Sequence, residues 1–304
     1  MIPIVFSTDH NFIMPTGVAI LSMLECAINT KLDIFILQSD SVTENDRETL
    51  RSIVFPYSSR ISFISMGEWF DDAFEIREIT IATYYRLLIP WIIPQYDKII
   101  YCDGDVIFCD NIKELYELPL GENYVAGVCP SEYDKNAFKD YAWKIGVDVN
   151  KYLNAGIMLI NSKKQREAKI DKEYLLHAKK RYLLQDQDII NIVCDHHKAY
   201  MPMRYNCPPD KGHLKGMCII HYFGKKPWKT FTHSWMRWWE VYRRSPFYDE
   251  VFELEVANKI LNPIYTQRQL ASLFMRKNMP WVMSMRKNIL SNSYIKKYLL
   301  GKGE

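Results

Sequence analysis

The sequence predicts an α/β protein in which a mainly parallel sheet is flanked by helices. Over the first half of the chain, short β-branched apolar runs alternate with stretches of helical periodicity, which is the pattern of βαβ units. Several of these runs end in polar residues or glycine, as strands do at the ligand-binding edge of an open sheet. The 304 residues, of which 48% are apolar and 25% charged, are enough for one large domain with an appendage.

The first elements follow one another in a regular order. Strands are expected over residues 2–7, 32–37 and 61–64, with helices over residues 15–28 and 43–53 between them. Thr43 is the expected N-cap of the second helix. Thr8, Asp9 and Asn11 follow the first strand, where Asp9 and Asn11 could hydrogen-bond a base or ribose, or simply cap the loop. No GxGxxG follows this strand, which disfavours a dinucleotide-binding Rossmann site.

The rest of the chain is organised around residues 97–110, DKIIYCDGDVIFCD. Two apolar runs flank Asp103-Gly104-Asp105, which predicts a buried strand that ends in two carboxylates. Residues i and i+2 of an extended strand project to the same side, so both carboxylates could bind one Mg²⁺ or Mn²⁺ ion. Asp-Gly-Asp is also common turn chemistry, and the tripeptide alone favours a turn.

Two further segments place polar groups beside apolar runs. Residues 80–88 are expected to be helical and carry Arg86 just ahead of the Asp103 strand, although an arginine is more often on the surface or ion-paired. Asn154, Ala155 and Gly156 open a strand that is otherwise fully apolar. Glycine permits close approach of a ligand and asparagine offers both a donor and an acceptor, while a β-bulge explains the small residues equally well.

A basic amphipathic helix is expected over residues 162–181, followed by a dense polar block, Gln185 to Asp188, ahead of an apolar helix. Asp186 or Asp188 would suit the start of that helix as a cap and as a partner of the helix dipole. This role accounts for one residue of the block but not for all of them, so Asp186 and Gln187 are candidate site residues.

Residues 217–228, MCIIHYFGKKPW, repeat the logic of the Asp103 stretch. A strand ends at His221, a candidate metal ligand, and Gly224, Lys225 and Lys226 follow, which suits a phosphate. Four of the eight tryptophans lie within residues 228–239, and core packing is the commoner reason for such a cluster than stacking on a sugar.

The composition is that of a soluble globular protein whose cysteine thiols are reduced. Seven cysteines without CxxC spacing argue for free thiols, and the N-terminus lacks the basic region of a secretory signal. Residues 264–304 carry eight basic residues and one acidic residue, a net +7, which leaves −4 for residues 1–263. Because this tail is also helical in pattern and aromatic, it is expected to bind an anionic membrane surface, with a solvated helical appendage as the alternative.

As a set, these stretches resemble glycosyltransferase family 8, the retaining enzymes that include glycogenin and bacterial lipopolysaccharide galactosyl- and glucosyltransferases. The matching pieces occur in the family's order over residues 4–228: VFSTDHNF, TYYRL, YCDGDVIF, YLNAGIMLIN, LLQDQDIIN and IIHYFGKKPW. The resemblance implies a GT-A fold over residues 1–263, followed by the tail. It also implies a UDP-sugar donor, such as UDP-glucose or UDP-galactose, and Mn²⁺ or Mg²⁺ as the cofactor.

The resemblance also implies roles for single residues. Asp103, Asp105 and His221 match the metal ligands, Asp9 and Asn11 the uridine-binding residues, and Gly224 and Lys226 the diphosphate loop. The residues that match positions around the donor sugar are Arg86, Asn154, Asp186 and Gln187. Two departures stand out: Lys225 alone separates Gly224 from Lys226, so either lysine could contact the diphosphate, and His10 replaces a residue that is often acidic.

The mechanism expected from these residues is transfer of a hexose with retention, by front-face attack of a glycan acceptor. Gln187 is expected to shield the sugar and Asp186 to hold its hydroxyls, with lipopolysaccharide or another cell-surface glycan as the acceptor. The expected location is the cytoplasm, on the inner face of the plasma membrane. Two alternatives stay open: a metal-dependent nucleotidyltransferase, and a non-catalytic sugar-binding protein of the same fold at the membrane.

Overall fold

The computed structural model describes residues 1–70, 72–75, 80–129, 135–212 and 215–261. By its internal contacts the chain divides into two units, Met1–Asp249 and Glu250–Glu304. The described part of the second unit is one helix, α10 (Glu250–Leu261). The basic tail expected over residues 264–304 lies outside the described residues.

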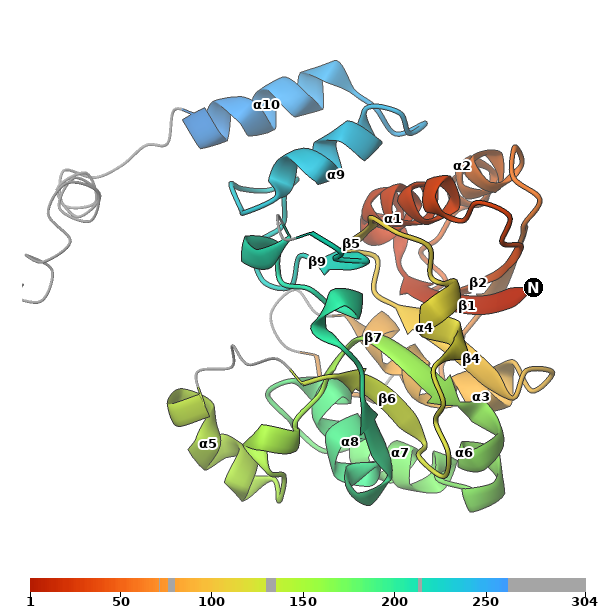
Figure 1. The fold of residues 1–304 in the computed structure, drawn as a ribbon, viewed down its shortest axis with the longest axis vertical. Coiled ribbons are helices and arrows are strands. Elements are labelled where there is room, and N and C mark those ends of the chain that lie inside the picture. The colour runs from red at the N-terminus through yellow and green to blue at the C-terminus, as the bar shows by residue number, and fades with distance from the viewer. Residues whose placement is uncertain (71, 76–79, 130–134, 213–214, 262–304) are drawn as a thin grey trace, which may run out of the picture. The chain divides into compact units, whose positions relative to one another are not determined.

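The first unit is built on a seven-stranded sheet among the described residues, with the strand order β3-β2-β1-β4-β7-β6-β8 (Figure 1). Its strands are β1 (Ile2–Thr8), β2 (Leu32–Gln38), β3 (Arg60–Ser65), β4 (Lys98–Cys102), β6 (Val125–Val128), β7 (Asn154–Asn161) and β8 (Lys198–Tyr200). β1 pairs in parallel with β2 and β4, β2 with β3, and β6 with β8, whereas β7 runs antiparallel to its neighbours β4 and β6. The prediction of a mainly parallel sheet is therefore confirmed.

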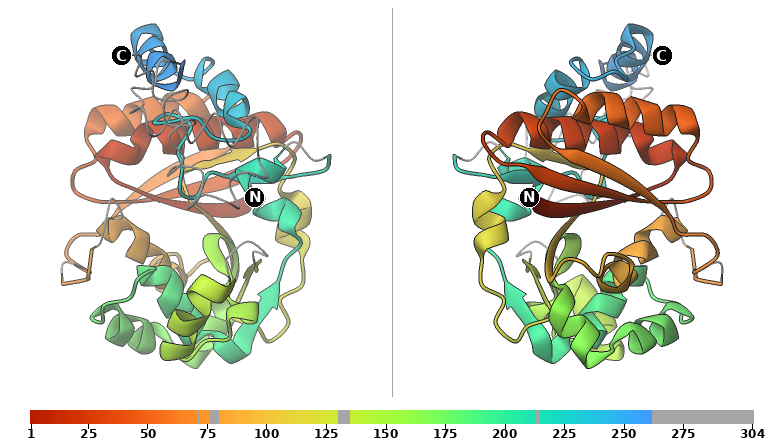
Figure 2. Two further views of the ribbon diagram at one scale, coloured as in Figure 1. Left: turned by 90° about the vertical axis from the view of Figure 1, so that its left-hand side faces the viewer. Right: turned by 90° about the vertical axis from the view of Figure 1, so that its right-hand side faces the viewer.

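Helices cover both faces of the sheet (Figure 2). α1 (Ile13–Cys26) and α2 (Glu44–Val54) lie on one face, and α6 (Ser162–Ala168), α7 (Asp171–Ala178) and α8 (Gln185–Val193) lie on the other. One apolar cluster among the described residues joins β1, β2, β4 and β7 to α7, α8 and the segment before β4, and α1 and α2 bury further apolar side chains on the opposite face. Burying these faces is the main stabilising contribution to the unit.

The remaining helical segments are short. They are η1 (His10–Phe12), η2 (Ile81–Leu88), α3 (Ile89–Ile92), α4 (Lys113–Glu117), α5 (Lys135–Lys144), η3 (Val149–Lys151), η4 (Asp195–His197), η5 (Met203–Tyr205), η6 (Pro209–Lys211) and α9 (Trp235–Tyr242). None of the helices in the described part of the chain combines the length and apolar character that a bilayer span requires.

The expected N-cap of α2 is confirmed, since Thr43 and Asp46 form a reciprocal capping box. Two expected helices differ from the prediction. Residues 81–88 form a 3₁₀ helix, and the helix expected over 162–181 is two helices, because Lys169 adopts a left-handed φ of 55° that ends α6. The next helix then starts with the acidic residues Asp171 and Glu173, which suit its positive N-terminal end.

A separate two-stranded ribbon, β5 (Val106–Phe108) and β9 (Ile219–His221), carries part of the site. The strands are antiparallel, and Val106 lies directly opposite His221. Behind them, Trp238 and Trp239 of α9 are fully buried and pack against Tyr242 with ring centroids 5.1 and 5.2 Å apart. The expectation that the tryptophan cluster serves mainly for packing is confirmed for these two residues.

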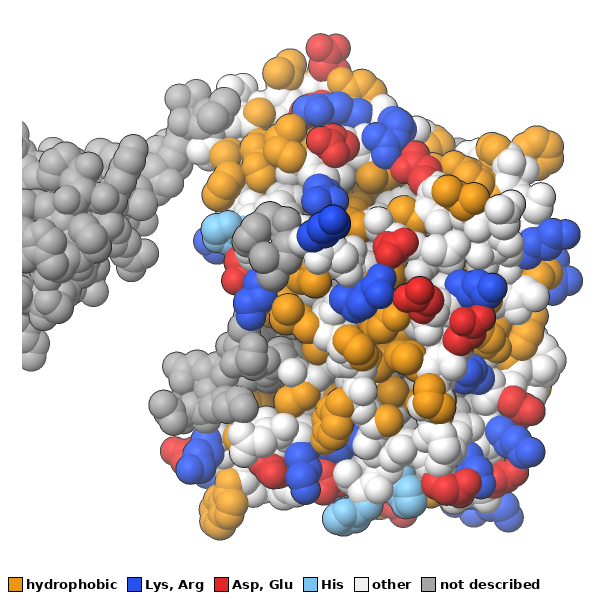
Figure 3. Space-filling view, viewed as in Figure 1, with side chains coloured by type: hydrophobic (Ala, Val, Ile, Leu, Met, Phe, Trp, Pro, Cys, Tyr) orange, Lys and Arg blue, Asp and Glu red, His pale blue; other side chains and the backbone are white. Residues whose placement is uncertain are grey.

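The cysteines and surface charges of the described residues agree with the composition. All seven cysteines are free thiols, as expected. On the face shown in Figure 3, basic, acidic and apolar side chains are interspersed. The described surface on this side therefore has no broad basic area of the kind that polyanions bind.

Candidate active site

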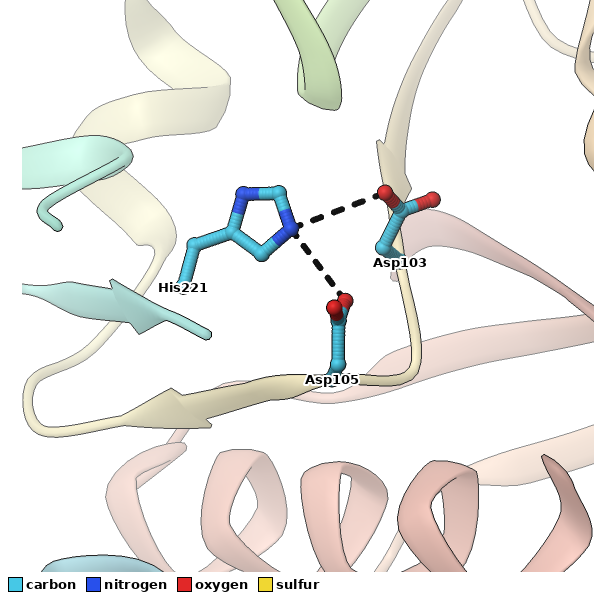
Figure 4. A group of neighbouring side chains, drawn as sticks. All are labelled: Asp103, Asp105 and His221. Atoms are coloured by element: carbon cyan, nitrogen blue, oxygen red, sulfur yellow. Dashed lines mark ion pairs between the residues drawn. The ribbon is translucent and has the colours of Figure 1, made fainter. Parts of the chain in front are cut away.

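Three side chains from different parts of the sequence meet at the end of the sheet (Figure 4). Asp103 follows β4, Asp105 precedes β5, and His221 ends β9. His221 Nε2 lies 3.2 Å from an oxygen of Asp105 and 3.7 Å from an oxygen of Asp103. The Asp105 and His221 side chains are 7% and 3% exposed, whereas that of Asp103 is 25% exposed, so the group opens to solvent on the Asp103 side.

Two glycines allow these segments to approach one another. A Cβ on Gly104 would lie 2.4 Å from Thr16 Oγ1, so this glycine lets the Asp103–Asp105 turn pack on the start of α1. A Cβ on Gly156 would lie 2.1 Å from His221 Cε1 and 2.8 Å from an Asp103 oxygen. The space that any larger residue would fill at position 156 is therefore taken by the imidazole, which explains the glycine there. The β6–β7 register also shifts between Gly127 and Val128, as the expected β-bulge would require.

The three residues fit a divalent metal ion. Asp103, Asp105 and His221 each offer one ligand atom, and these atoms lie within 4.8 Å of one another. Two carboxylates and an imidazole suit Mn²⁺ well and Mg²⁺ acceptably. Among the described residues, this is the group of three or more His, Cys, Asp or Glu side chains whose ligand atoms lie close enough together to hold a metal ion.

Arg86 of η2 links the metal-ligand candidate Asp103 to α8. Its guanidinium contacts Asp103 at 2.8 Å and Asp186 at 3.0 Å, donates to the Ala155 carbonyl at 2.7 Å, and stacks over Tyr101. Burial opposes a charge here, but the two carboxylates outweigh it and raise the pKa of Arg86. The alternative expectation was an arginine on the surface or in an ion pair. Arg86 is 6% exposed and therefore not on the surface, whereas its ion pairs with Asp103 and Asp186 confirm the second part.

Asp186 and Gln187 lie on the first turn of α8, facing β7. Burial raises the pKa of Asp186 to about 6, although Arg86 acts in the opposite direction. Gln187 Oε1 accepts a hydrogen bond of 3.0 Å from the Ala155 N–H. The segments of Asn154 and Asp186 are thereby joined, so the structure brings the residues expected around the donor sugar together.

Asp188 is held in the interior. It is fully buried, and its carboxylate accepts hydrogen bonds from Tyr152, from Tyr141 at 2.6 Å and from the Leu184 N–H at 2.8 Å. Burial raises its pKa, while the hydrogen bonds from the two tyrosines lower it. A carboxylate held in this way anchors α8 and is poorly placed to attack a substrate.

The two lysines of the 224–226 loop differ in position. Lys226 Nζ binds the Asp105 carboxylate and the Tyr222 carbonyl at 3.1 Å, whereas Lys225 is exposed. Burial opposes ionisation of Asp105, but Lys226 and His221 outweigh it and hold its pKa well below the usual range. Gly224 has a φ of 86°, a left-handed conformation that lets the loop fold back.

Asp9 and Asn11 line a pocket of about 340 Å³, together with Ser39, Asp40, Ser41, Gly67, Glu75, Thr80, Ile81, Ala82 and Tyr85. Asp9 is fixed on both oxygens, by the Phe12 N–H at 3.1 Å and by Thr80 at 2.9 Å. Thr8 is 1% exposed and contacts Thr16, so its side chain lies beneath the pocket rather than in it. Asp9 and Asn11 therefore line the pocket, and Asp9 also caps the turn that follows it, which was the alternative expectation.

Four residues around the site were not anticipated from the sequence: Tyr101, Tyr141, Tyr152 and Asn206. Tyr101 donates to Asp103 at 2.8 Å, and Asn206 lies 2.9 Å from His221 Nδ1. Tyr101 and Tyr152 lie inside the stretches around Asp103 and Asn154, where they fit the surrounding apolar pattern. Tyr141 and Asn206 lie outside every stretch that points to a site. Tyr141, Tyr152 and Asn206 contact residues that are 47, 36 and 15 positions away in the sequence. Only the folded protein brings these partners together.

Fold and site together define a class: α/β proteins with an acidic edge that fits a divalent metal ion, next to a pocket at the ends of parallel strands. The family model "Glycosyl transferase family 8" matches residues 3–232, and the chain belongs to this family. The family prediction is therefore confirmed.

Relatives agree with this assignment. The chain is 26% identical to the lipopolysaccharide 1,3-galactosyltransferase of Salmonella typhimurium over 251 residues, which cover 76% of this chain and 73% of that protein. It is 25% identical to the lipopolysaccharide glucosyltransferase WaaO of Escherichia coli, with the same coverage. It is 29% identical to a Haemophilus influenzae protein named "Putative glycosyltransferase" over 68% of this chain, and the match spans 63% of that relative.

Solved structures confirm the GT-A fold. The galactosyltransferase LgtC, solved in complex with donor and acceptor sugar analogs, has a TM-score of 0.69 at 26% identity, over 84% of this chain and 100% of LgtC. The bifunctional glycosyltransferase WbbM has a TM-score of 0.71 at 23% identity, over 86% of this chain and 52% of WbbM.

Proposed function

We propose that the chain is a metal-dependent, retaining glycosyltransferase that moves a hexose from a UDP-sugar to a glycan acceptor. The observation that carries this proposal is the convergence of Asp103, Asp105 and His221. Beside them lie the buried cation Arg86 and the amide side chains of Asn154 and Gln187. Relatives that act on lipopolysaccharide support a lipopolysaccharide or another cell-surface glycan as the acceptor. UDP-glucose and UDP-galactose are the proposed donors.

The nucleotide is proposed to lie in the pocket lined by Asp9 and Asn11. The Asp9 carboxylate and the Asn11 amide can hydrogen-bond the N–H and carbonyl groups of uracil or the hydroxyls of ribose. Asp40 and Glu75 make this pocket acidic, which disfavours a phosphate there. The diphosphate therefore belongs at the Asp105 side, where Lys226, rather than the exposed Lys225, supplies the positive charge.

Asp103, Asp105 and His221 would hold Mn²⁺ or Mg²⁺, which supplies Lewis acidity for the charge that develops on the departing diphosphate. Lys226 adds a second positive charge on the same side once its contact with Asp105 is exchanged for phosphate. Arg86 keeps Asp103 and Asp186 at fixed positions, since it contacts both carboxylates. Asn154, whose Oδ1 is occupied by the Gly156 N–H, offers its Nδ2 to the sugar.

Retention is proposed to occur by front-face attack, in which the departing diphosphate oxygen takes the acceptor's proton. Gln187 is held against β7 by the Ala155 N–H, and the remaining lone pair of its amide oxygen is proposed to shield an oxocarbenium-like sugar. Asp186 is the proposed ligand of the sugar hydroxyls. Asp188 is excluded from the proposed mechanism as a nucleophile because its oxygens already accept hydrogen bonds from two tyrosines and a backbone amide.

The proposed organisation is a catalytic domain over residues 1–263 with a basic, aromatic tail over residues 264–304. The tail, with its net charge of +7, is proposed to hold the protein on the cytoplasmic, anionic face of the plasma membrane.

The test is release of UDP from UDP-glucose, UDP-galactose and their N-acetyl forms with Mn²⁺, and again after chelation. Asp103→Ala and Asp105→Ala are expected to lower this release by about 10²–10³-fold, because the charge of the leaving diphosphate is no longer stabilised. Asp110→Ala is the matched control, since Asp110 lies just beyond β5 but pairs with Arg204 outside the site. Activity that persists in both site variants would remove the metal site from the proposal. Release of hexose 1-phosphate in place of UDP would show cleavage between the two phosphates and indicate a nucleotidyltransferase.

A further inference from the structure

The metal-ligand candidate His221 is held from behind by an asparagine. Asn206 follows η5, and its Oδ1 lies 2.9 Å from His221 Nδ1. Asn206 is 3% exposed and His221 is 2% exposed. Because the contact is shielded from water, protein groups alone decide which of the two atoms carries the hydrogen.

Backbone hydrogen bonds fix the position of Asn206 beside the ribbon. The Cys218 N–H donates to the Arg204 carbonyl at 2.8 Å, the Cys207 N–H to the Ile219 carbonyl at 2.9 Å, and the His221 N–H to the Cys207 carbonyl at 2.8 Å. The segment before Cys207 therefore runs alongside β9, and Asn206 is held in register with the imidazole.

The hydrogen in this contact can be assigned by following the hydrogen bonds back to a backbone amide. The Gly156 N–H can only donate, so the Asn154 side-chain atom 2.9 Å from it is the acceptor Oδ1. The Asn206 atom 2.8 Å from that oxygen must then be a donor, Nδ2. The other amide atom of Asn206, Oδ1, is an acceptor, and it faces Nδ1 of His221.

An acceptor opposite Nδ1 requires the proton to be on Nδ1. A neutral imidazole carries one N–H, so Nε2 then has the lone pair. Nε2 is the atom that faces Asp105 at 3.2 Å and Asp103 at 3.7 Å. In this neutral state three acceptor atoms converge on one point. A second proton on Nε2 completes the arrangement in the metal-free protein, and a metal ion would take the place of that proton.

We propose that Asn206 is a positioning residue that holds His221 in the Nδ1–H tautomer, so that Nε2 is ready to bind the metal ion. This inference rests on the metal site of the proposed function and identifies the residue that orients its imidazole. The series of hydrogen bonds that ends at Asn206 begins at Gly156 and Asn154 of β7, so this strand also sets the tautomer of His221. Loss of such an outer partner typically weakens metal binding by about 10–100-fold.

The first test is a spectrum of the metal-free protein. Long-range ¹H–¹⁵N NMR of ¹⁵N-histidine-labelled protein, at a pH where His221 is neutral, shows which ring nitrogen carries the proton, and the His221→Ala variant identifies the signal. The expected wild-type result is a proton on Nδ1. A proton on Nε2 would overturn the proposal, whatever the protein's activity.

The second test compares variants by Mn²⁺ titration, with free Mn²⁺ followed by electron paramagnetic resonance. Asn206→Leu is expected to lose the Nδ1–H tautomer and to bind Mn²⁺ about 10–100-fold more weakly. Asn206→Asp loses the donor to Asn154 but keeps an acceptor opposite Nδ1, so it is expected to retain the Nδ1–H tautomer and to bind Mn²⁺ more tightly than Asn206→Leu. Asn191→Leu is the matched control, because it removes a fully buried amide that binds the Leu153 backbone instead of His221.

Each outcome of these tests bears on one proposal. Unchanged Mn²⁺ affinity in Asn206→Leu, or an equal loss in Asn191→Leu, contradicts the role of Asn206. If the wild-type protein binds no Mn²⁺, the metal site of the proposed function fails, while the wild-type NMR spectrum still decides the tautomer. If Asn206→Leu does not fold, the spectrum of the wild type and the behaviour of Asn206→Asp carry the test.

Discussion

Removing the buried cation of the site should have a large and pH-dependent cost. Arg86 has a side chain that is 5% exposed and contacts Asp103 and Asp186, whose side chains are 25% and 6% exposed. Arg86→Met fills a similar volume but leaves both carboxylates without their partner. Breaking a buried ion pair from one side costs about 3–5 kcal/mol of unfolding free energy. For a unit of this size each kcal/mol lowers the melting temperature by about 2–4 °C, so a decrease of about 6–20 °C is expected.

The pH dependence follows from Asp186, whose pKa is raised by burial to about 6, from the usual value of 3.8. Below this pKa the folded protein carries a proton on Asp186, and an uncharged carboxyl needs no cation. Arg86 lowers the pKa of Asp186, so its removal raises that pKa further. The destabilisation by Arg86→Met should therefore be larger at about pH 8, where Asp186 is ionised, than at about pH 5.

Thermal and urea unfolding of Arg86→Met, Asp186→Asn and the double variant measure this coupling. The double variant should recover about 1–3 kcal/mol relative to the sum of the single losses, because the amide introduced in place of Asp186 has no charge that needs a partner. Arg204→Met is the matched control: Arg204 also joins two carboxylates, but Asp110 and Glu114 are 53% and 70% exposed. Its expected cost is about 0–1 kcal/mol. Equal melting temperatures for Arg86→Met and Arg204→Met would refute this account of the buried pair.

Two further predictions concern the edges of the site. Gly156→Ala places a methyl group against the His221 ring and should lower sugar transfer by about 10²-fold with little change in far-UV circular dichroism, so undiminished activity would show that the imidazole can shift without cost. The hydrogen bond from His10 to Asp46, 2.7 Å long, raises the pKa of His10 above 6.5. The stabilisation from this pair is present below that value and is lost as the pH rises through the folded-state pKa, so His10→Ala should lower the melting temperature more at about pH 6 than at about pH 9. A deficit that grows with pH would contradict it.

The order of strands and helices could largely be predicted from the sequence, and the exceptions have local causes. Lys169 divides an expected helix because its backbone is left-handed, and a lysine gives no sign of that conformation. Residues 81–88 satisfy helical periodicity but form a 3₁₀ helix, since periodicity reports which side is buried and not which hydrogen-bond pattern forms.

The site shows the same division. Asp103, Asp105 and His221 could be singled out because each lies at the end of an apolar run, where a strand delivers it to an edge. The choice between Lys225 and Lys226 could not be made, because two adjacent lysines differ only in the direction that the folded loop assigns to them. Asn206 and Tyr101 were missed because their function lies in the atoms that they face, at His221 and Asp103.

The sequence by itself therefore determined the α/β class, the family and the candidate residues of the metal site, because strand ends and short polar motifs are local features of the chain. The tertiary structure decided which of those residues touch, which lysine turns inward, and which nitrogen of His221 carries its proton. These outcomes depend on hydrogen bonds and packing between residues that are about 15 to 120 positions apart, such as Asn206 with His221 and Asp105 with Lys226. Only the folded chain brings such partners within reach of each other.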